Sequence, residues 1–175
     1  MIQEDTLRSM FADRLNSIMH ASGTDVDDLS FALNAERVTV RNWVTGKALP
    51  GTHYFIELVN LFRVTPGSLL GTTNHSVKME REHSIAELSS EFFAKLQSTL
   101  KERGISIPCF AENYLYITSN TLTYTIKHGC LPNMIRVVEV AEALDLDIDH
   151  MLGVPSLMVP FHATPLWEAQ YGKEE

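Results

Sequence analysis

Residues 24–50 read TDVDDLSFALNAERVTVRNWVTGKALP, and this stretch decides the fold of the first part of the chain. It predicts a short helix with Thr24 as its N-cap and aspartates in the first turn, where carboxylates are favourable. Asn34 then stands where a left-handed conformation turns the chain sharply. A second short helix over about residues 36–45 ends at Gly46. The positions expected to be buried follow helical spacing: Leu29, Ala32, Leu33, Val40 and Trp43.

Three more helices are predicted around this pair. A longer helix precedes it, capped by Asp5 or Thr6, and Ser22-Gly23 ends it. After the loop that closes with Pro50, Thr52 caps a fourth helix, and Pro66 opens a short fifth one. The apolar positions of the first and fourth helices recur every three or four residues: Leu7, Phe11, Leu15, Ile18, Phe55, Ile56, Val59 and Phe62.

The chain then repeats this pattern. Leu7, Phe11 and Leu15 recur 81 positions later as Leu88, Phe92 and Leu96, and Gly23 recurs as Gly104. Further on, the offset is 82: its pairs are Pro50 with Pro132, Phe62 with Leu144, and Leu70-Gly71 with Leu152-Gly153. With two copies, such a period indicates duplication of a compact domain rather than a solenoid.

We therefore expect an all-α protein of two tandem five-helix domains. The first domain covers residues 1–71 and the second covers 84–153, with a polar linker over residues 72–83 between them. Residues 154–175 form an apolar C-terminal tail, which we expect to pack on a core or on a partner chain. Each domain is small enough to need such packing.

Composition excludes several classes of function. The 175 residues carry a net charge of −8, which argues against indiscriminate nucleic-acid binding. Residues 1–75 hold six lysine or arginine and eight acidic residues, against five and nine in residues 84–153, so the first copy is the less acidic one. No apolar run approaches the ~20 residues of a membrane span, and the polar N-terminus is no signal peptide.

We also expect no catalysis, no cofactor and no metal. Phosphate-loop, nucleophile-elbow and zinc-protease motifs do not occur. The acidic series Asp145, Asp147 and Asp149 lacks the glycine and distal glutamate of a calcium loop, so helix capping explains it better. Cys109 and Cys130 are expected to be reduced thiols in a cytoplasmic protein, one or both partly buried.

Two short helices, a tight turn, and a Trp-x-x-Gly ending before a basic loop and a proline form a helix-turn-helix pattern. The first copy resembles the lambda-repressor/Cro (XRE-type) family over residues 7–71. The residues that carry this resemblance are Leu29-Ser30, Asn34, Val40, Trp43, Gly46-Lys47 and Pro50. The chain departs from the family at Ser30, where alanine is typical, and at Asn34, where glycine is typical.

This resemblance implies that the second helix of the pair enters the major groove of double-stranded DNA. Arg37 and Asn42 would then pair with guanine and adenine, and Val38 would touch a thymine methyl. Arg41, Lys47 and Thr24, with the N–H groups after Thr24, would bind the DNA backbone. Two departures weigh against it: Val26 replaces a frequent glutamine, and three aspartates crowd the same surface.

The second copy has a less distinct reading helix. Two extra residues fall around its turn and helix, and the buried roles go either to Leu122 and Ile126 or to Leu122 and Thr125. The polar residues of the region form a possible second DNA site: Ser119, Asn120, Thr121, Tyr124 and Lys127. Because Lys127 is the only charge among them, we expect a domain turned to protein contact, with a second DNA-reading head as the alternative.

The function expected is that of a sequence-specific transcriptional regulator of bacterial or phage type, which in this family more usually represses than activates. The second domain and tail would build a homodimer on palindromic DNA. Two alternatives stay open. One is an interaction protein that does not bind DNA, such as an antirepressor, an inhibitor or an antitoxin. The other is a monomer with two DNA-reading heads.

Overall fold

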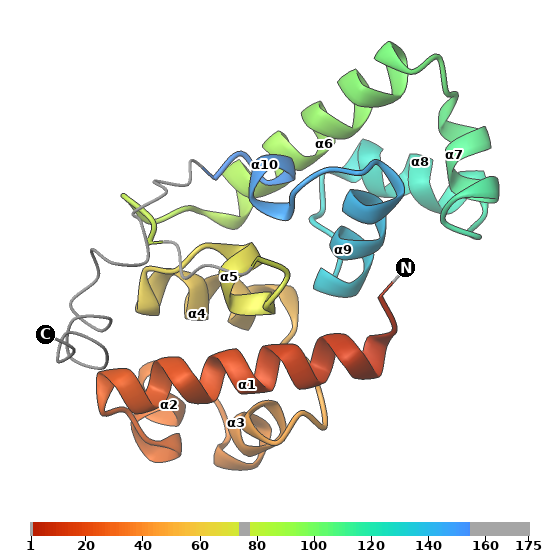
Figure 1. The fold of residues 1–175 in the computed structure, drawn as a ribbon. Helices are drawn as coiled ribbons and strands as arrows, with labels where there is room; N and C mark the ends of the chain where they lie inside the picture. The colour runs from red at the N-terminus through yellow and green to blue at the C-terminus, as the bar shows by residue number, and fades with distance from the viewer. Residues whose placement is uncertain (1, 74–77, 155–175) are drawn as a thin grey trace, which may run out of the picture.

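The computed structural model describes residues 2–73 and 78–154, and within them the protein is all-α, as predicted (Figure 1). The first half contains α1 (Glu4–Ser22), α2 (Val26–Ala32), α3 (Arg37–Val44), α4 (Thr52–Phe62) and α5 (Pro66–Leu70). The second half contains α6 (Ile85–Glu102), α7 (Ile107–Asn113), α8 (Ser119–His128), α9 (Met134–Ala143) and α10 (Ile148–Met151). These ranges hold no strand, although an isolated antiparallel bridge joins Val64 to Lys78. Apart from Val154, the predicted tail lies outside the described residues.

The backbone repeats between the halves as the sequence does. Asn34 has the predicted left-handed conformation, with φ 47°, and its counterpart Tyr116 has φ 52°. Every residue with positive φ in the described ranges belongs to such a pair. The pairs are Gly23 and Gly104, Asn34 and Tyr116, Gly46 and Gly129, Arg63 and Asp145, and Gly71 and Gly153. The two halves therefore turn the chain at the same points. Six of these ten residues are glycines, and the other four carry side chains.

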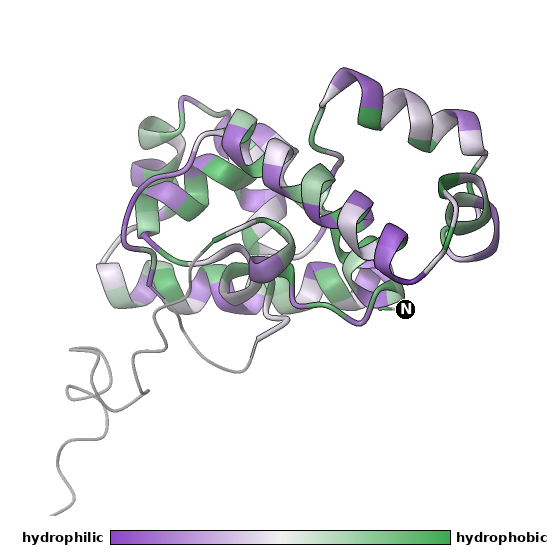
Figure 2. Ribbon diagram, turned by 90° about the horizontal axis from the view of Figure 1, so that it is seen from above, coloured by the Kyte–Doolittle hydropathy of each residue, from purple (hydrophilic) through white to green (hydrophobic). Residues whose placement is uncertain are grey.

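The long helices supply much of the core. Each carries apolar residues on one side and polar residues on the other (Figure 2). The residues that the repeat paired are buried in both: Leu7, Phe11, Leu15, Leu88, Phe92 and Leu96. This confirms the predicted inward faces.

Three predicted N-caps are wrong. The N-cap of α1 is Gln3, not Asp5 or Thr6, and that of α4 is Gly51, because Thr52 is already the first residue of the helix. Asp25, not Thr24, caps α2: its carboxylate accepts from the N–H groups of Asp27 and Asp28, and Asp28 accepts in return from Asp25 N–H. Thr24 belongs to the end of α1, because its N–H donates to Met19 O at 2.9 Å.

The two halves pack together through α5 and α10, which lie in the middle of the molecule (Figure 1). Two hydrogen bonds across this seam are counterparts of each other. Ile2 N–H, before α1, donates to Glu142 Oε2 of α9 at 2.8 Å. His83 N–H, before α6, donates to Asn60 Oδ1 of α4 at 3.0 Å. The segment before each long helix therefore binds the fourth helix of the other half.

The predicted linker is packed where the structure describes it. Met79 is buried, and its N–H donates to Arg63 O at 2.9 Å. His83 is buried as well, and burial lowers the pKa of its imidazole. The polar composition of residues 72–83 did not indicate these contacts.

The halves differ most around α8. In the first half α1 packs against α3, whereas the corresponding helices α6 and α8 are less closely packed. Instead α8 packs mainly on α7, and both lie at the far end of the second half in Figure 1. The second half thus keeps the order of helices but not the packing of its third helix.

Candidate nucleic-acid interface

The pair α2 and α3 is held by a small apolar core. Leu29, Leu33, Val40 and Trp43 are buried as predicted, whereas Ala32 is exposed and its predicted burial is wrong. The centroid of the Trp43 ring lies 5.2 Å from that of Tyr54 in α4. Ala35 N–H donates to Ser30 O at 3.0 Å, which closes the turn around Asn34. The orientation of α3 is therefore fixed from its inward side.

The opposite side of α3 carries the residues predicted to contact DNA. Arg37 and Arg41 are exposed, Val38 is 57% exposed, and Asn42 is half-buried. Lys47 is exposed in the loop that follows, and its N–H donates to Asn42 O at 2.9 Å. Among the described residues, neither Arg41 nor Lys47 forms an ion pair. These five side chains form one surface, which we call the α3 face.

Arg37 is engaged in an ion pair across the turn. Its Nε lies 2.6 Å from Asp27 Oδ1 of α2, and both side chains are mostly exposed. An exposed pair of this kind contributes little stability, about 0–1 kcal/mol. The pair holds the Arg37 guanidinium beside α2 without burying it.

The start of α2 is occupied by its own carboxylates. The N–H groups of Asp25, Asp27 and Asp28 all donate to aspartate oxygens. The hydrogen bond from Asp28 N–H, with those from Asp27 N–H and the charge of Arg37, lowers the pKa of Asp25 although slight burial opposes them. Thr24 lies beside this cap, and its hydroxyl contacts Ser22 Oγ at 2.8 Å. The amides predicted to bind a phosphate here already have acidic partners.

The corresponding surface of the second half is α8. Asn120, Thr121, Tyr124 and Lys127 are exposed, and Ser119 is half-buried. The Tyr124 ring, 65% exposed, lies 4.0 Å from the ring of His128. Inward, Leu122 is buried, whereas Thr125 and Ile126 are both half-buried, so neither predicted pairing of buried residues describes the helix fully.

Sequence reasoning missed a set of exposed aromatic residues. Phe31 on α2 is 91% exposed and Tyr116 before α8 is 82% exposed. Tyr114 is also exposed. Helical spacing could have predicted the exposure of Phe31, because Leu29 and Leu33 point inward and Phe31 lies between them. Tyr116 shares the left-handed position of Asn34, where the side chain points to solvent.

Cys109 and Cys130 are both free and exposed, so the expected partial burial is wrong. Cys109 lies in the first turn of α7, and Cys130 lies in the loop after α8. Asp147 caps α10 by accepting from the N–H groups of Asp149 and His150, as capping predicted. Within the described residues, no group of three acidic, histidine or cysteine side chains is placed to hold a metal ion.

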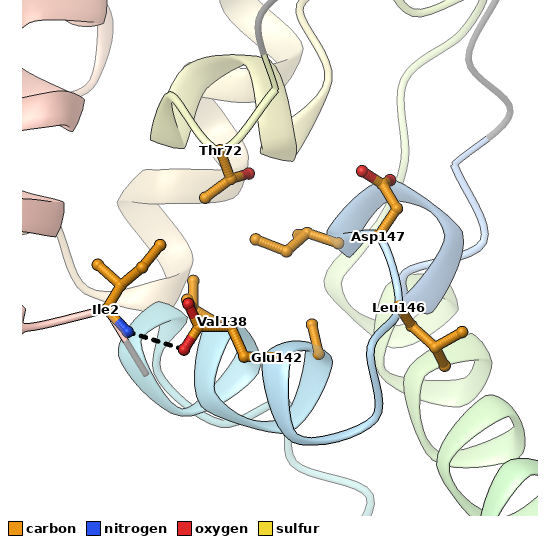
Figure 3. A pocket seen from close by; sticks show the side chains of 8 residues that line it. Ile2, Thr72, Val138, Glu142, Leu146 and Asp147 are labelled. Carbon is orange, nitrogen blue, oxygen red and sulfur yellow. Dashed lines mark hydrogen bonds between the residues drawn. The ribbon is translucent and has the colours of Figure 1, made fainter.

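A cavity of about 180 Å³ lies at the seam between the halves (Figure 3). Its two carboxylates are engaged by backbone: Glu142 accepts from Ile2 N–H, and Asp147 caps α10. The rest of its lining is largely apolar, including Val138 and Leu146. We regard this cavity as part of the packing between halves.

Comparison of the chain with protein-family models, with curated proteins and with solved structures finds no match. Of the helices in the described ranges, none has the length and apolar character needed to cross a membrane.

Proposed function

We propose that the protein is a sequence-specific DNA-binding regulator of transcription, with the α3 face as its reading surface, acting in the cytoplasm. The observation that supports this is the arrangement of α3. Val40 and Trp43 anchor it from inside, which leaves Arg37, Val38 and Asn42 along its outer side. A short helix anchored in this way can enter the major groove and present side chains to base edges.

The ion pair of Arg37 does not prevent this role. Breaking an exposed pair costs about 0–1 kcal/mol. A bidentate contact between arginine and guanine contributes roughly 1–3 kcal/mol of discrimination. Guanine can therefore displace Asp27 from Arg37, while Asp27 would oppose binding to other sequences.

Backbone contacts would come from Arg41 and Lys47. Both are exposed at or after the C-terminal part of α3, and both are cationic. Because the start of α2 is acidic and its amides are occupied, we expect little phosphate binding there. The contact of Thr24 with the DNA backbone stays a prediction, and it would involve the Thr24 side chain only.

The second half would serve protein contact. Its α8 surface carries Tyr124 and a single lysine, so it offers phosphates little attraction. Exposed tyrosines suit protein interfaces because they combine apolar area with a polar end. In this proposal the second half, with the tail, supports a homodimer on a palindrome, and repression follows when the bound dimer excludes other proteins from the site.

One observation favours a second candidate, an interaction protein that does not bind DNA. The cap of α2 places Asp25, Asp27 and Asp28 next to the α3 face. Acidic side chains at this point repel a phosphate backbone, and the whole chain has a charge of −8. An antirepressor, inhibitor or antitoxin would need no such attraction.

The deciding experiment is selection of sheared genomic DNA on the purified protein, followed by sequencing. It is run beside Arg37→Ala/Asn42→Ala, and beside Gln97→Ala/Lys101→Ala as a matched control. The control also removes one cation and one amide, but from the exposed side of α6. We expect an enriched palindrome that survives in the control, disappears in the α3 variant, and binds less tightly as salt rises.

Other results would change the proposal. An enriched site without internal symmetry, weakened by Asn120→Ala/Lys127→Ala, would indicate two reading heads on one chain. Absence of enrichment with a folded protein would reject DNA reading and leave the interaction protein.

A further inference from the structure

The second half contains a cavity of about 190 Å³ between α6, α8 and α9. Phe92 and Phe93 of α6 and Val140 of α9 line its apolar side, and Leu122 of α8 completes it. Thr125 and Arg136 contribute polar side chains. No part of the proposed DNA-reading surface lies in this cavity.

The cavity stands where the first half has an aromatic pair. An offset of 82, which relates Asn34 to Tyr116, places Thr125 opposite Trp43, whereas the offset of 83 between Gly46 and Gly129 places Ile126 there. After the helix the offset is 82 again, so Arg136 stands opposite Tyr54. In the first half Trp43 is buried, and its ring packs 5.2 Å from that of Tyr54. Thr125 and Ile126 are both half-buried and both smaller than tryptophan, so either register leaves space between the third helix and the rest of the second half.

The size and lining suit a single aromatic ring. Apolar cavities of about 150 Å³ in other proteins hold benzene, so this one has room for a ring with a small substituent. Phe92 and Phe93 pack edge to face, with ring centroids 5.2 Å apart. They offer a ligand ring the tilted contacts that aromatic groups prefer.

The polar side of the cavity selects the substituent. Arg136 uses Nη1 for both of its contacts, to Leu115 O at 3.3 Å and to Glu139 Oε2 at 2.5 Å. These contacts hold the guanidinium in place, and neither involves Nε or Nη2. A guanidinium edge pairs with a carboxylate through two parallel hydrogen bonds, and the Thr125 hydroxyl can add another.

We propose that this cavity binds a small aromatic carboxylate, with its ring against Phe92 and Phe93 and its carboxylate at Arg136. The ligand would take the place that Trp43 has in the first half and would join α8 to α6 and α9. Its binding would stabilise the α7–α8 segment, whose two helices pack mainly on each other. The site does not depend on DNA binding.

Benzoate is the probe, and benzamide is its neutral analogue of nearly the same shape. The full chain is titrated with each, and binding is followed by calorimetry and by amide shifts in NMR spectra. We expect saturable benzoate binding with shifts around Leu122 and Thr125, and at least roughly tenfold weaker binding of benzamide. Arg136→Gln should remove this preference, and Arg136→Lys should keep part of it.

Filling the cavity provides the structural control. Thr125→Trp should abolish benzoate binding, while Thr123→Trp, on the exposed side of the same helix, should leave it unchanged. Thr125→Met serves if the tryptophan variant does not fold, and it should weaken binding at least severalfold. The proposal is overturned if benzoate does not bind, if benzamide binds equally well, or if the variants at Thr125 bind benzoate as the wild type does.

Discussion

The carboxylate of Asp149 accepts a hydrogen bond of 2.7 Å from the backbone N–H of Gly67, and this contact joins equivalent positions of the two halves. Asp149 stands 82 positions after Gly67, the offset that also relates α10 to α5. A Cβ on Gly67 would lie 3.2 Å from the Asp149 oxygens and 3.1 Å from Thr73 Cγ2. At the seam, therefore, the second copy supplies the carboxylate of Asp149, and the first copy supplies the amide of Gly67 and the space left by its missing side chain.

The burial of Asp149 at this contact predicts that the stability of the protein depends on pH. Asp149 is 3% exposed, and burial raises the pKa of its carboxyl from an ordinary 3.8 to about 6. Hydrogen bonds from Thr65 and Gly67 oppose the rise, and the nearby charge of Asp147 adds to it. Because the folded state binds the proton more tightly, the stabilisation is complete below pH 3.8 and is lost as pH rises through 6.

As the pH rises from 4.5 to 7.5, we expect the ionisation of Asp149 to lower the free energy of unfolding by about 1–3 kcal/mol. Asp149→Asn removes this loss, so denaturant unfolding at both pH values isolates it. His83 acts in the opposite sense, because its lowered pKa makes the folded state more stable as pH rises. The variant should therefore gain stability with pH. Asp145→Asn, at an exposed position in the loop before α10, is the control. Equal pH slopes in wild type and Asp149→Asn would refute the assignment.

Helix capping gives a second prediction. Asp25→Ala should destabilise the protein by about 1 kcal/mol, because two N–H groups lose their acceptor at the start of α2. Thr24→Ala should cost clearly less, since the Thr24 hydroxyl contacts only Ser22 and its N–H bond to Met19 is retained. Thermal or urea unfolding measures both variants. A larger loss for Thr24→Ala would restore Thr24 as the functional cap.

The contrast between these two residues shows how far the sequence could predict the fold. The period of Leu7, Phe11 and Leu15 fixes an apolar helix face without reference to the rest of the molecule. The choice between Thr24 and Asp25 depends on where α1 ends, because the last turn of α1 binds Thr24 N–H. Two adjacent residues that can both cap a helix are not separated by local pattern alone.

The candidate site was predictable in the same uneven way. The outward positions of α3 follow from the burial of Val40 and Trp43. The pairing of Arg37 with Asp27 joins residues ten positions apart, and it depends on the angle that the turn at Asn34 sets between α2 and α3. Predicting the cavity beside Thr125 would have required the alignment of the two copies across the inserted residues, and the sequence left that alignment open.

Backbone strain gives a third prediction. Tyr116 has φ 52° and is 82% exposed, so its side chain contributes little packing while its backbone is in a region that glycine adopts more easily. Tyr116→Gly should raise the free energy of unfolding by up to about 1 kcal/mol. Tyr124→Gly, at an exposed position inside α8, should lower it by about 1 kcal/mol. Equal destabilisation by both substitutions would show that the backbone of Tyr116 is not strained.

The ion pair across the turn gives the last prediction, which concerns DNA. Asp27→Asn frees Arg37 and removes a negative charge beside the α3 face, so DNA affinity should rise roughly two- to tenfold at low salt. Stability should change by less than about 1 kcal/mol, because the pair is exposed. Asp13→Asn, which removes an exposed charge from α1, measures the effect of net charge alone. If both variants bind the selected site equally, or if Asp27→Asn binds it more weakly, Asp27 does not compete with DNA for Arg37.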